Sequence, residues 1–437
     1  MKSGGGDGKK KILLALNDDG YGPLTFGFFM ARAFLRDHPN VDLTIRRGGR
    51  PGHVEEFEGW IRRYSGSAGH AASWKGVFAG VQRVDNLISV PKRDGAVDGP
   101  SMIQALRSYA RRRLEYLACP LESDWDLIVD FGVPVISALS ARACIRRFTI
   151  FDHGWGLSLD RIARECGANL SDKELRDAIE AIRKDESLTE MAYLFPPFLT
   201  PEEFQRHWVS LDVPVKIIPK VFGTHGPLDE VKEQATMSAK FGIPDGQKTV
   251  LISGGGTGVW DKIVPEIIKA LLQQEDLNYN VLAFVGDDAI RELLPDWSAP
   301  VQPVQPVDFV QTRSRWVKLL RMRQELIYQD IIDGVTLILT RAGGATVNDA
   351  IARHVPLLLI PEPGHWQVEK IREAVESMGL AFRSGIAFGD LQDPRKVTDI
   401  INKHIQDEKE LSRLRMNMES IEGDGESWFV EQMMALL

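Results

Sequence analysis

Cysteine is scarce in this sequence of 437 residues, which has three, at Cys119, Cys144 and Cys166. Three is an odd number, and no two of them have the CxxC spacing of a zinc or redox site. This scarcity excludes a small domain held together by disulfides and indicates a reducing compartment.

Long apolar runs are also missing. No stretch approaches the roughly 20 apolar residues that a membrane-spanning helix needs. Residues 1–8 are polar and lack the hydrophobic region of a signal peptide. We therefore expect a cytoplasmic protein.

An excess of positive charge is the third absence. The formal net charge is −8, which argues against nucleic acid as a partner because a phosphate-backbone binder normally carries a dominant basic patch. The local basic clusters at residues 111–113 and 142–147 favour solvated helix faces, with a peripheral contact to an anionic membrane as the alternative.

The length and the order of apolar runs predict two domains rather than one core. Each half alternates apolar strand-like runs with amphipathic helices, which is typical of a parallel, doubly wound sheet, and the halves separate near residue 220. The irregular parts are a charged helical region at residues 160–210 and a segment at 298–330, where prolines precede an expected basic helix. The expected strands are residues 11–16, 41–45, 126–131, 147–151, 213–218, 249–253, 280–285, 337–341 and 357–360.

The most informative segment is residues 337–361, in which an apolar run meets Gly343 and Gly344 and a short helix then opens at Thr346. A second apolar run follows Pro356. The pattern predicts a strand–loop–helix–strand unit, and the glycines allow a ligand to approach the helix N-terminus. Such an N-terminus presents unpaired N–H groups and a partial positive charge, so it favours a phosphate.

A second small-residue loop is Gly254-Gly255-Gly256-Thr257-Gly258, at the end of an expected strand. It fits neither the dinucleotide fingerprint nor the Walker pattern. Because ligands of open α/β sheets lie outside the carboxyl ends of the strands, loops 254–258 and 343–346 are predicted to hold a diphosphate from two sides.

Polar residues beyond loop 343–346 suit the rest of a nucleotide sugar. Asp349 lies three residues after Thr346 on the same side of the helix, where its carboxylate is placed to accept hydrogen bonds from a ribose diol. His365 and Gln367, after Pro361, supply an imidazole and an amide suited to sugar hydroxyls. The alternative for Asp349 is a first-turn residue that interacts with the helix dipole. The alternative for His365 and Gln367 is a polar helix cap.

These residues resemble the donor-binding signature of GT-B glycosyltransferases, in particular the UDP-glycosyltransferase superfamily and the N-acetylglucosaminyltransferase that makes the lipid-linked disaccharide of peptidoglycan. Arg341 stands where that family has an arginine or histidine, Asp349 matches its ribose-binding acid and Gln367 its sugar-contacting glutamine. Trp366 and Lys370 depart from the family's aspartate and asparagine. The resemblance covers residues 250–381 and is weak in the first half.

The resemblance implies a GT-B fold, with two Rossmann-like doubly wound domains facing across a cleft. Residues 1–219 would bind the acceptor and 220–437 the nucleotide sugar, the last helix returning to the first domain. It implies inverting, metal-independent transfer of a sugar from a UDP or dTDP donor to a hydroxyl of a small molecule, lipid or glycan, without a cofactor. The implied donor-binding residues are Gly255, Gly256, Thr257, Gly258, Arg341, Gly343, Gly344, Ala345, Thr346, Asp349, His365 and Gln367.

The general base is the open part of this interpretation, since the family's histidine is replaced by Pro23-Leu24-Thr25. The candidates are Asp19, which follows the first strand, and His153, in a later loop. A GT-B-like sugar-nucleotide epimerase or hydrolase, and a binding module without a base, are alternative functions. A third is a metal-dependent nucleotidase, because Asp18 and Asp19 resemble the paired aspartates that open survival-protein-E-type nucleotidases.

Overall fold

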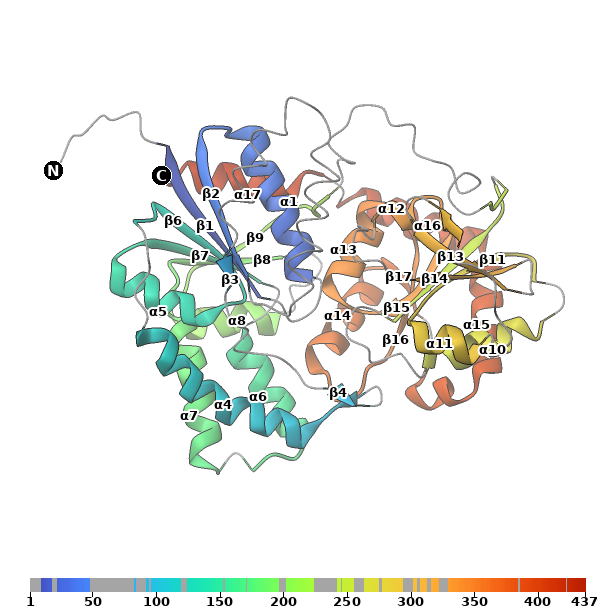
Figure 1. Ribbon diagram of the computed structural model, residues 1–437, viewed down its shortest axis with the longest axis horizontal. Helices are drawn as coiled ribbons and strands as arrows, with labels where there is room; N and C mark the ends of the chain where they lie inside the picture. The colour runs from blue at the N-terminus through green and yellow to red at the C-terminus, as the bar shows by residue number, and fades with distance from the viewer. Residues whose placement is uncertain are drawn as a thin grey trace.

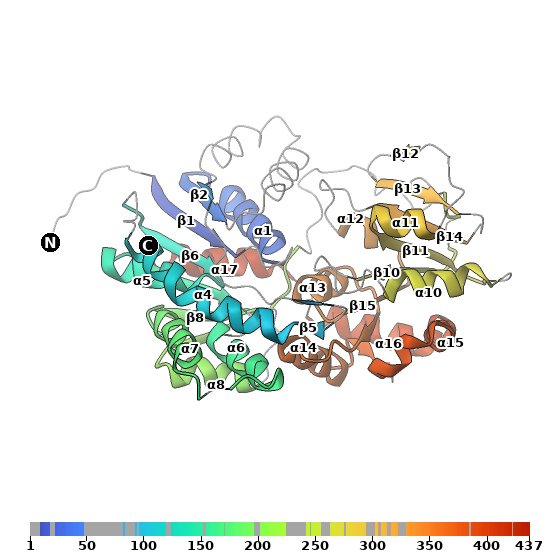
Figure 2. The same ribbon diagram turned by 60° about the horizontal axis from the view of Figure 1, so that its bottom comes forward.

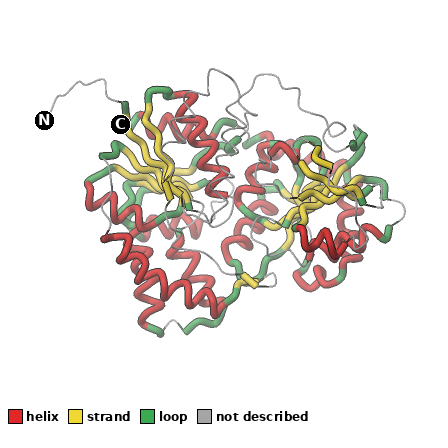
Figure 3. The backbone as a smooth tube through the Cα atoms, viewed as in Figure 1, coloured by secondary structure: helices red, strands yellow, loops and turns green. Residues whose placement is uncertain are grey.

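The computed structural model describes most of the chain. The described residues are 9–17, 22–47, 82–83, 92–93, 96–118, 124–151, 154–169, 171–195, 202–223, 242–244, 246–254, 263–274, 277–293, 302–304, 307–312, 316–321, 329–383, 386–421 and 423–437. They form two α/β units, each with a central sheet flanked by helices (Figures 1 and 3).

The first sheet has seven parallel strands in the order β3-β2-β1-β6-β7-β8-β9. Its centre is largely apolar on both faces because helices cover both sides, as expected for a parallel sheet. An antiparallel pair, β4 (Lys92–Arg93) and β5 (Ala96–Val97), stands apart from it. The strands are β1 (Lys10–Leu16), β2 (Val41–Arg47), β3 (Gln82–Arg83), β6 (Leu127–Phe131), β7 (Arg146–Phe151), β8 (Met191–Leu194) and β9 (Val215–Ile217).

The helices of this unit bury their apolar faces in three clusters around the sheet. Strand β8 lies inside the region that was expected to be helical, so that prediction was wrong for residues 191–194. Its four residues are largely buried between β7 and β9, and strand pairing there overrides the helical charge pattern of the flanking segments. The helices are α1 (Gly22–Asp37), α4 (Gly99–Ala118), α5 (Pro134–Ala143), α6 (Trp155–Glu165), α7 (Lys173–Glu186) and α8 (Glu202–Ser210).

The second sheet has eight strands in the order β12-β13-β14-β11-β10-β15-β16-β17. From β14 to β17 all neighbours are parallel, while β12 and β13 are antiparallel additions. The parallel part repeats the order of the first sheet, so the expected pair of doubly wound units is confirmed. The strands are β10 (Thr249–Ser253), β11 (Asn280–Val285), β12 (Gln302–Val304), β13 (Val307–Gln311), β14 (Val317–Arg321), β15 (Leu337–Arg341), β16 (Leu357–Ile360) and β17 (Ala381–Phe382).

The basic helix expected within residues 298–330 is wrong where the structure describes this segment. Val317, Leu319 and Leu320 are buried in β14, which pairs with β11. A short apolar run is compatible with helix or strand, and here pairing with β11 on one side and β13 on the other selects the strand. The helices of the second unit are α10 (Ile263–Leu272), α11 (Asp287–Leu293), α12 (Gln329–Ile332), α13 (Gly344–Ala352), α14 (Trp366–Ser377), α15 (Pro394–Gln406) and α16 (Glu408–Glu419), and the 3-10 turn η1 (Phe388–Gln392) precedes α15. Helix α17 (Gly425–Met434) follows α16 in the chain.

Helix α17 does not pack on the second sheet. It lies against α1, and Phe429, Val430 and Met433 belong to the core of the first unit (Figure 2). Its start requires a glycine, because a Cβ atom on Gly425 would lie 2.3 Å from the carbonyl oxygen of Lys220. The end of the chain is therefore docked on the segment that connects the two sheets.

A buried ion pair fixes α17 to α1. Glu426 is fully buried, and Arg32, with 3% of its surface exposed, donates from Nη2 to Glu426 Oε1 at 3.2 Å. Both Glu426 oxygens also accept from the backbone N–H of Gly223 at 3.1 Å. Burial raises the pKa of Glu426 to about 7, although the attraction of Arg32 opposes this shift.

This shift predicts a pH dependence of stability. The pKa of Glu426 is higher in the folded protein than the usual 4.5, so the folded protein binds more protons between these two values. The free energy of unfolding is expected to fall as the pH rises from about 4.5 to 7, by about 3 kcal/mol from this group. Denaturant unfolding from pH 5 to 8 should show this slope, and Glu426→Gln should flatten it.

The matched control is Glu431→Gln, which changes an exposed glutamate of the same helix. That variant should keep the pH slope of the unmodified protein. Equal slopes in the Glu426 variant and in this control would contradict the assignment of the slope to Glu426.

Candidate functional site

Gly254 and Gly343, which begin the two glycine loops, follow the two strands at the switch point of the second sheet. Strands β10 and β15 are adjacent and parallel, with Ser253 opposite Thr340, and the strand order reverses between them. The carboxyl ends of both strands therefore open at the same edge, where doubly wound sheets bind ligands. Gly254 follows β10 there, while Gly255, Gly256, Thr257 and Gly258 lie outside the described residues.

Helix α13 begins beside this switch point. Gly343 is its N-cap, with extended backbone and no side-chain capping bond, and the first turn holds no acidic residue. The helix starts at Gly344, two residues before the predicted Thr346, so Ala345 and Thr346 belong to its first turn. An N-terminus of this kind leaves main-chain N–H groups for an anion.

Asp349 lies one turn further along α13. It is 2% exposed, and its Oδ1 accepts a long hydrogen bond of 3.4 Å from the side-chain amide of Asn348. A largely buried carboxylate is costly unless it has partners. Its position three residues after Thr346 is the one that the sequence indicated.

A charged cluster follows the carboxyl ends of β15 and β16. Arg341 Nη1 lies 2.7 Å from Glu362 Oε2, and His365 Nδ1 lies 2.8 Å from Glu362 Oε1. A Cβ atom on Gly343 would lie 3.6 Å from Arg341 Nε, so the guanidinium stands beside the start of α13. The structure thus brings Arg341, His365 and loop 343–346 together around one carboxylate, Glu362.

The sequence offered Glu362 only as one of the carboxylates after Pro361 that suit sugar hydroxyls. The side chain is 1% exposed, and its backbone N–H donates to Glu369 Oε1 at 2.5 Å. An acid directly after an apolar strand was the available signal, but only the fold shows that it joins Arg341 to His365.

Trp366 points away from the second sheet. Its ring packs in a core cluster of the first unit, edge-on to Phe204 with ring centres 5.5 Å apart, and Arg161 lies 5.9 Å from its centre. The residue that replaces the family's aspartate therefore joins the two units. Gln367 follows it in the first turn of α14 and is partly exposed.

The two candidate bases, Asp19 and His153, lie outside the described residues, as does Asp18, but their neighbours converge. The side chains of Asn17 and Trp155 both donate to the carbonyl oxygen of Gly132, at 3.1 and 3.0 Å. Asn17, directly after β1, and Trp155, at the start of α6, are thus held at one point, at the carboxyl edge of the first sheet.

A buried acid and a histidine support the second of these loops. Glu186 lies 2.9 Å from His207 Nε2 and accepts from the backbone N–H of Gly156 at 3.2 Å. A Cβ atom on Gly154 would lie 2.1 Å from His207 Nε2, so only glycine fits there. The sequence placed His153 in a loop without identifying these supports.

The N-termini of two helices from different units meet. A Cβ atom on Gly22, at the start of α1, would lie 3.6 Å from Ala345 Cβ, in the first turn of α13. Figure 1 shows the two helices side by side between the sheets. Gly22 at the start of α1 therefore lies directly beside the first turn of α13.

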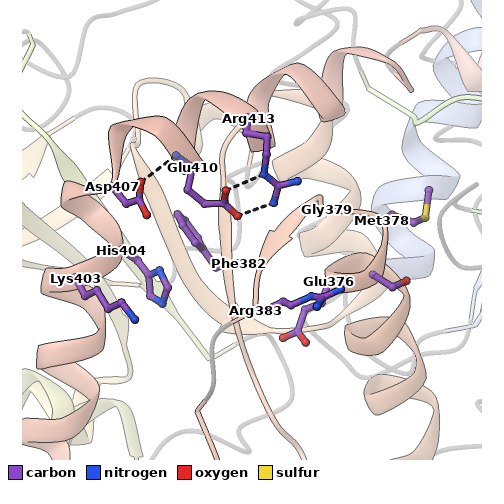
Figure 4. A pocket seen from close by; sticks show the side chains of 11 residues that line it. Glu376, Met378, Gly379, Phe382, Arg383, Lys403, His404, Asp407, Glu410 and Arg413 are labelled. Atoms are coloured by element: carbon purple, nitrogen blue, oxygen red, sulfur yellow. Dashed lines mark hydrogen bonds and ion pairs between the residues drawn. The ribbon is translucent and has the colours of Figure 1, made fainter.

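A surface pocket of about 520 Å³ shares no residue with these loops (Figure 4). Its charges largely satisfy one another, since Arg413 pairs with both Glu410 oxygens at 2.7 and 2.6 Å and Asp407 caps the backbone N–H of Glu410. Phe382 and His404 also line it, with ring centres 4.4 Å apart and ring planes tilted by 48°. This pocket gives no reason to place the chemistry there.

The described part of the chain contains no group of three or more histidine, cysteine or acidic side chains arranged to hold a metal ion. Within the same residues, no helix combines the length and the apolar character that crossing a membrane requires.

Known proteins similar to this chain bear on its fold and its sequence relatives. The chain matches no protein-family model. It is 26% identical over 189 residues to the UDP-N-acetylglucosamine--N-acetylmuramyl-(pentapeptide) pyrophosphoryl-undecaprenol N-acetylglucosamine transferase of Bacillus licheniformis. That match covers 41% of this chain and 45% of the relative, so the chain spans less than half the length of this curated relative.

Solved structures resemble the chain over nearly its whole length. The calicheamicin glycosyltransferase CalG4 has a TM-score of 0.58 at 16% identity, covering 97% of this chain and 98% of its own. S. aureus MnaA in complex with UDP has a TM-score of 0.55 at 12% identity, covering 98% of both chains. The resemblance predicted from the glycine loops is therefore confirmed: the chain is a two-domain protein of the GT-B fold, similar to the UDP-sugar glycosyltransferases.

Proposed function

We propose that this protein is a glycosyltransferase that moves a sugar from a uridine diphosphate donor to an acceptor hydroxyl, with inversion and without a metal. The observation that carries the proposal is the uncapped N-terminus of α13 at the β10–β15 switch point, with Asp349 one turn behind it. The curated relative uses a UDP-sugar by its name, which favours uridine over thymidine.

The proposed donor site combines three kinds of group. Main-chain N–H groups of loops 254–258 and 343–346 would hold the diphosphate, and Arg341 would add a positive charge beside it. Asp349 would bind the ribose diol, and His365 and Gln367 the sugar hydroxyls. Since N–H groups and a guanidinium stabilise the leaving diphosphate, this site needs no metal for that purpose.

The acceptor would lie on the first unit, at the carboxyl edge of its sheet. A base there, Asp19 or His153, would remove the proton of the acceptor hydroxyl, which then attacks the anomeric carbon. Closure of the two units would exclude water and limit hydrolysis of the donor. The acceptor is proposed to be a lipid, glycan or small molecule carrying a free hydroxyl.

Asp349→Ala is expected to weaken binding of UDP by about 10- to 100-fold, because the ribose loses charge-assisted hydrogen bonds worth about 1.5–3 kcal/mol. Titration calorimetry with UDP measures this directly. Asp399→Ala, which removes an exposed aspartate of α15, should bind UDP as the unmodified protein does. An unchanged dissociation constant for the Asp349 variant would refute the ribose role.

Incubation with UDP-N-acetylglucosamine alone separates transfer from its alternatives. Slow donor loss without acceptor, accelerated by an acceptor mixture, supports a transferase. Rapid acceptor-free conversion to free or isomerised sugar would instead indicate a hydrolase or epimerase. Tight UDP binding with no turnover in any mixture would indicate a binding module.

A further inference from the structure

The segment that connects the two sheets is held by one side chain of α13, that of Asn348. The side-chain Oδ1 of Asn348 accepts from the backbone N–H of Phe222 at 3.0 Å, and its Nδ2 donates to the carbonyl oxygen of the same residue at 3.1 Å. Asn348 is fully buried. Two bonds from one amide fix both the distance and the orientation between α13 and the connecting segment.

The same amide contacts the candidate ribose ligand. Asn348 Nδ2 also lies 3.4 Å from Asp349 Oδ1, so one NH₂ group contacts the connecting backbone and the carboxylate. A carboxylate that is oriented before the ligand arrives binds with less loss of conformational freedom.

The first unit holds the other side of the connecting segment. The ring of Phe222 stacks on Phe195 with ring centres 3.8 Å apart, whereas the preceding Val221 is buried in the core of the second unit. The backbone N–H of Gly223 is bound by Glu426 of α17. Successive residues are thus anchored in different units, and a movement between the units displaces the peptide groups that Asn348 binds.

We propose that Asn348 is a positioning residue that orients the Asp349 carboxylate relative to the connecting segment, so that nucleotide affinity depends on how that segment is held between the two units. This inference rests on the proposed function, since it takes Asp349 as the ribose ligand. In this proposal, Asn348 and Asp349 of α13 together make the binding of the nucleotide depend on the arrangement of the two units.

A double-mutant cycle on UDP affinity tests the inference. Asn348→Ala is expected to raise the dissociation constant for UDP about tenfold, the effect of one hydrogen bond to a charged group. In the Asp349→Ala background the same change should have no further effect, because Asn348 acts through that carboxylate. A residue with only a structural role would give the same effect in both backgrounds.

Asn417→Ala is the matched control, since Asn417 also donates from Nδ2 to a backbone carbonyl, that of Gly379, at 2.9 Å. It should leave UDP affinity unchanged. If Asn348→Ala does not fold, Asn348→Asp keeps an acceptor for the Phe222 N–H but replaces the donor by a carboxylate oxygen, whose negative charge repels Asp349. That variant should also weaken UDP binding at least tenfold.

The outcomes separate the two proposals. Unchanged UDP affinity in the Asn348 variants, or additive effects in the cycle, would overturn the inference while leaving the proposed donor site intact. Absence of UDP binding by the unmodified protein would overturn the proposed function, and the inference with it.

Discussion

Asp130→Ala is expected to lower the free energy of unfolding by about 3–5 kcal/mol, because it leaves the guanidinium of Arg147 buried without its counter-ion. Arg147 Nη2 lies 2.7 Å from Asp130 Oδ2, and both side chains are buried. Burial lowers the pKa of Arg147, against the attraction of Asp130. The same carboxylate accepts from Thr149 Oγ1 at 2.7 Å and from the backbone N–H of Val133 at 2.9 Å, at the start of α5.

Denaturant unfolding of a double variant separates the buried charge from the lost packing. Asp130→Ala combined with Arg147→Met removes the unpaired charge and should recover much of the stability. The control is Glu190→Ala, because Glu190 pairs at 3.3 Å with the exposed Arg146, which precedes Arg147 in β7. Loss of this surface ion pair should lower the free energy of unfolding by at most about 1 kcal/mol. A similar cost for Asp130→Ala and Glu190→Ala would disprove this account.

One of the two variants His153→Ala and Asp19→Ala is expected to reduce sugar transfer by roughly 100-fold or more, since a positioned general base contributes about that factor. Asn17 and Trp155, each two residues along the chain from one of these positions, both donate to the carbonyl oxygen of Gly132. The assay is release of UDP from UDP-N-acetylglucosamine with an acceptor that the unmodified protein uses.

The base acts on the acceptor and not on the nucleotide, so UDP affinity should survive its removal. Calorimetry with UDP therefore distinguishes a lost base from a damaged donor site. Asp42→Ala, an exposed aspartate of β2, serves as the control and should keep full turnover. Full transfer activity in both variants would eliminate both candidates.

The unit formed by β15, α13 and β16 was predictable from the sequence because its signals are local. An apolar run, a pair of glycines and a following proline specify a strand, a loop and a helix through backbone preferences that act over a few residues. Strand β15, helix α13 and strand β16 accordingly occur where the sequence indicated them. Arg341 and Asp349 keep the positions relative to loop 343–346 that the resemblance implied.

Where short-range signals are ambiguous, prediction failed. Residues 317–321 form a strand because they pair with β11, and residues 307–311 form one because they pair with residues 317–321. Strand β8 lies inside a stretch whose charge pattern favours helix. In each case a run of four or five residues is too short for its own periodicity to select one structure.

The sequence by itself determined two doubly wound units, the glycine loops and the acid that follows the second of them. Only the tertiary structure decided that Glu362 joins Arg341 to His365, that Trp366 packs into the opposite unit, and that Asn348 holds Phe222. These contacts join residues of separate elements, most of them far apart along the chain. Their partners are selected by burial and by the need of buried polar groups for hydrogen bonds, which no local pattern displays.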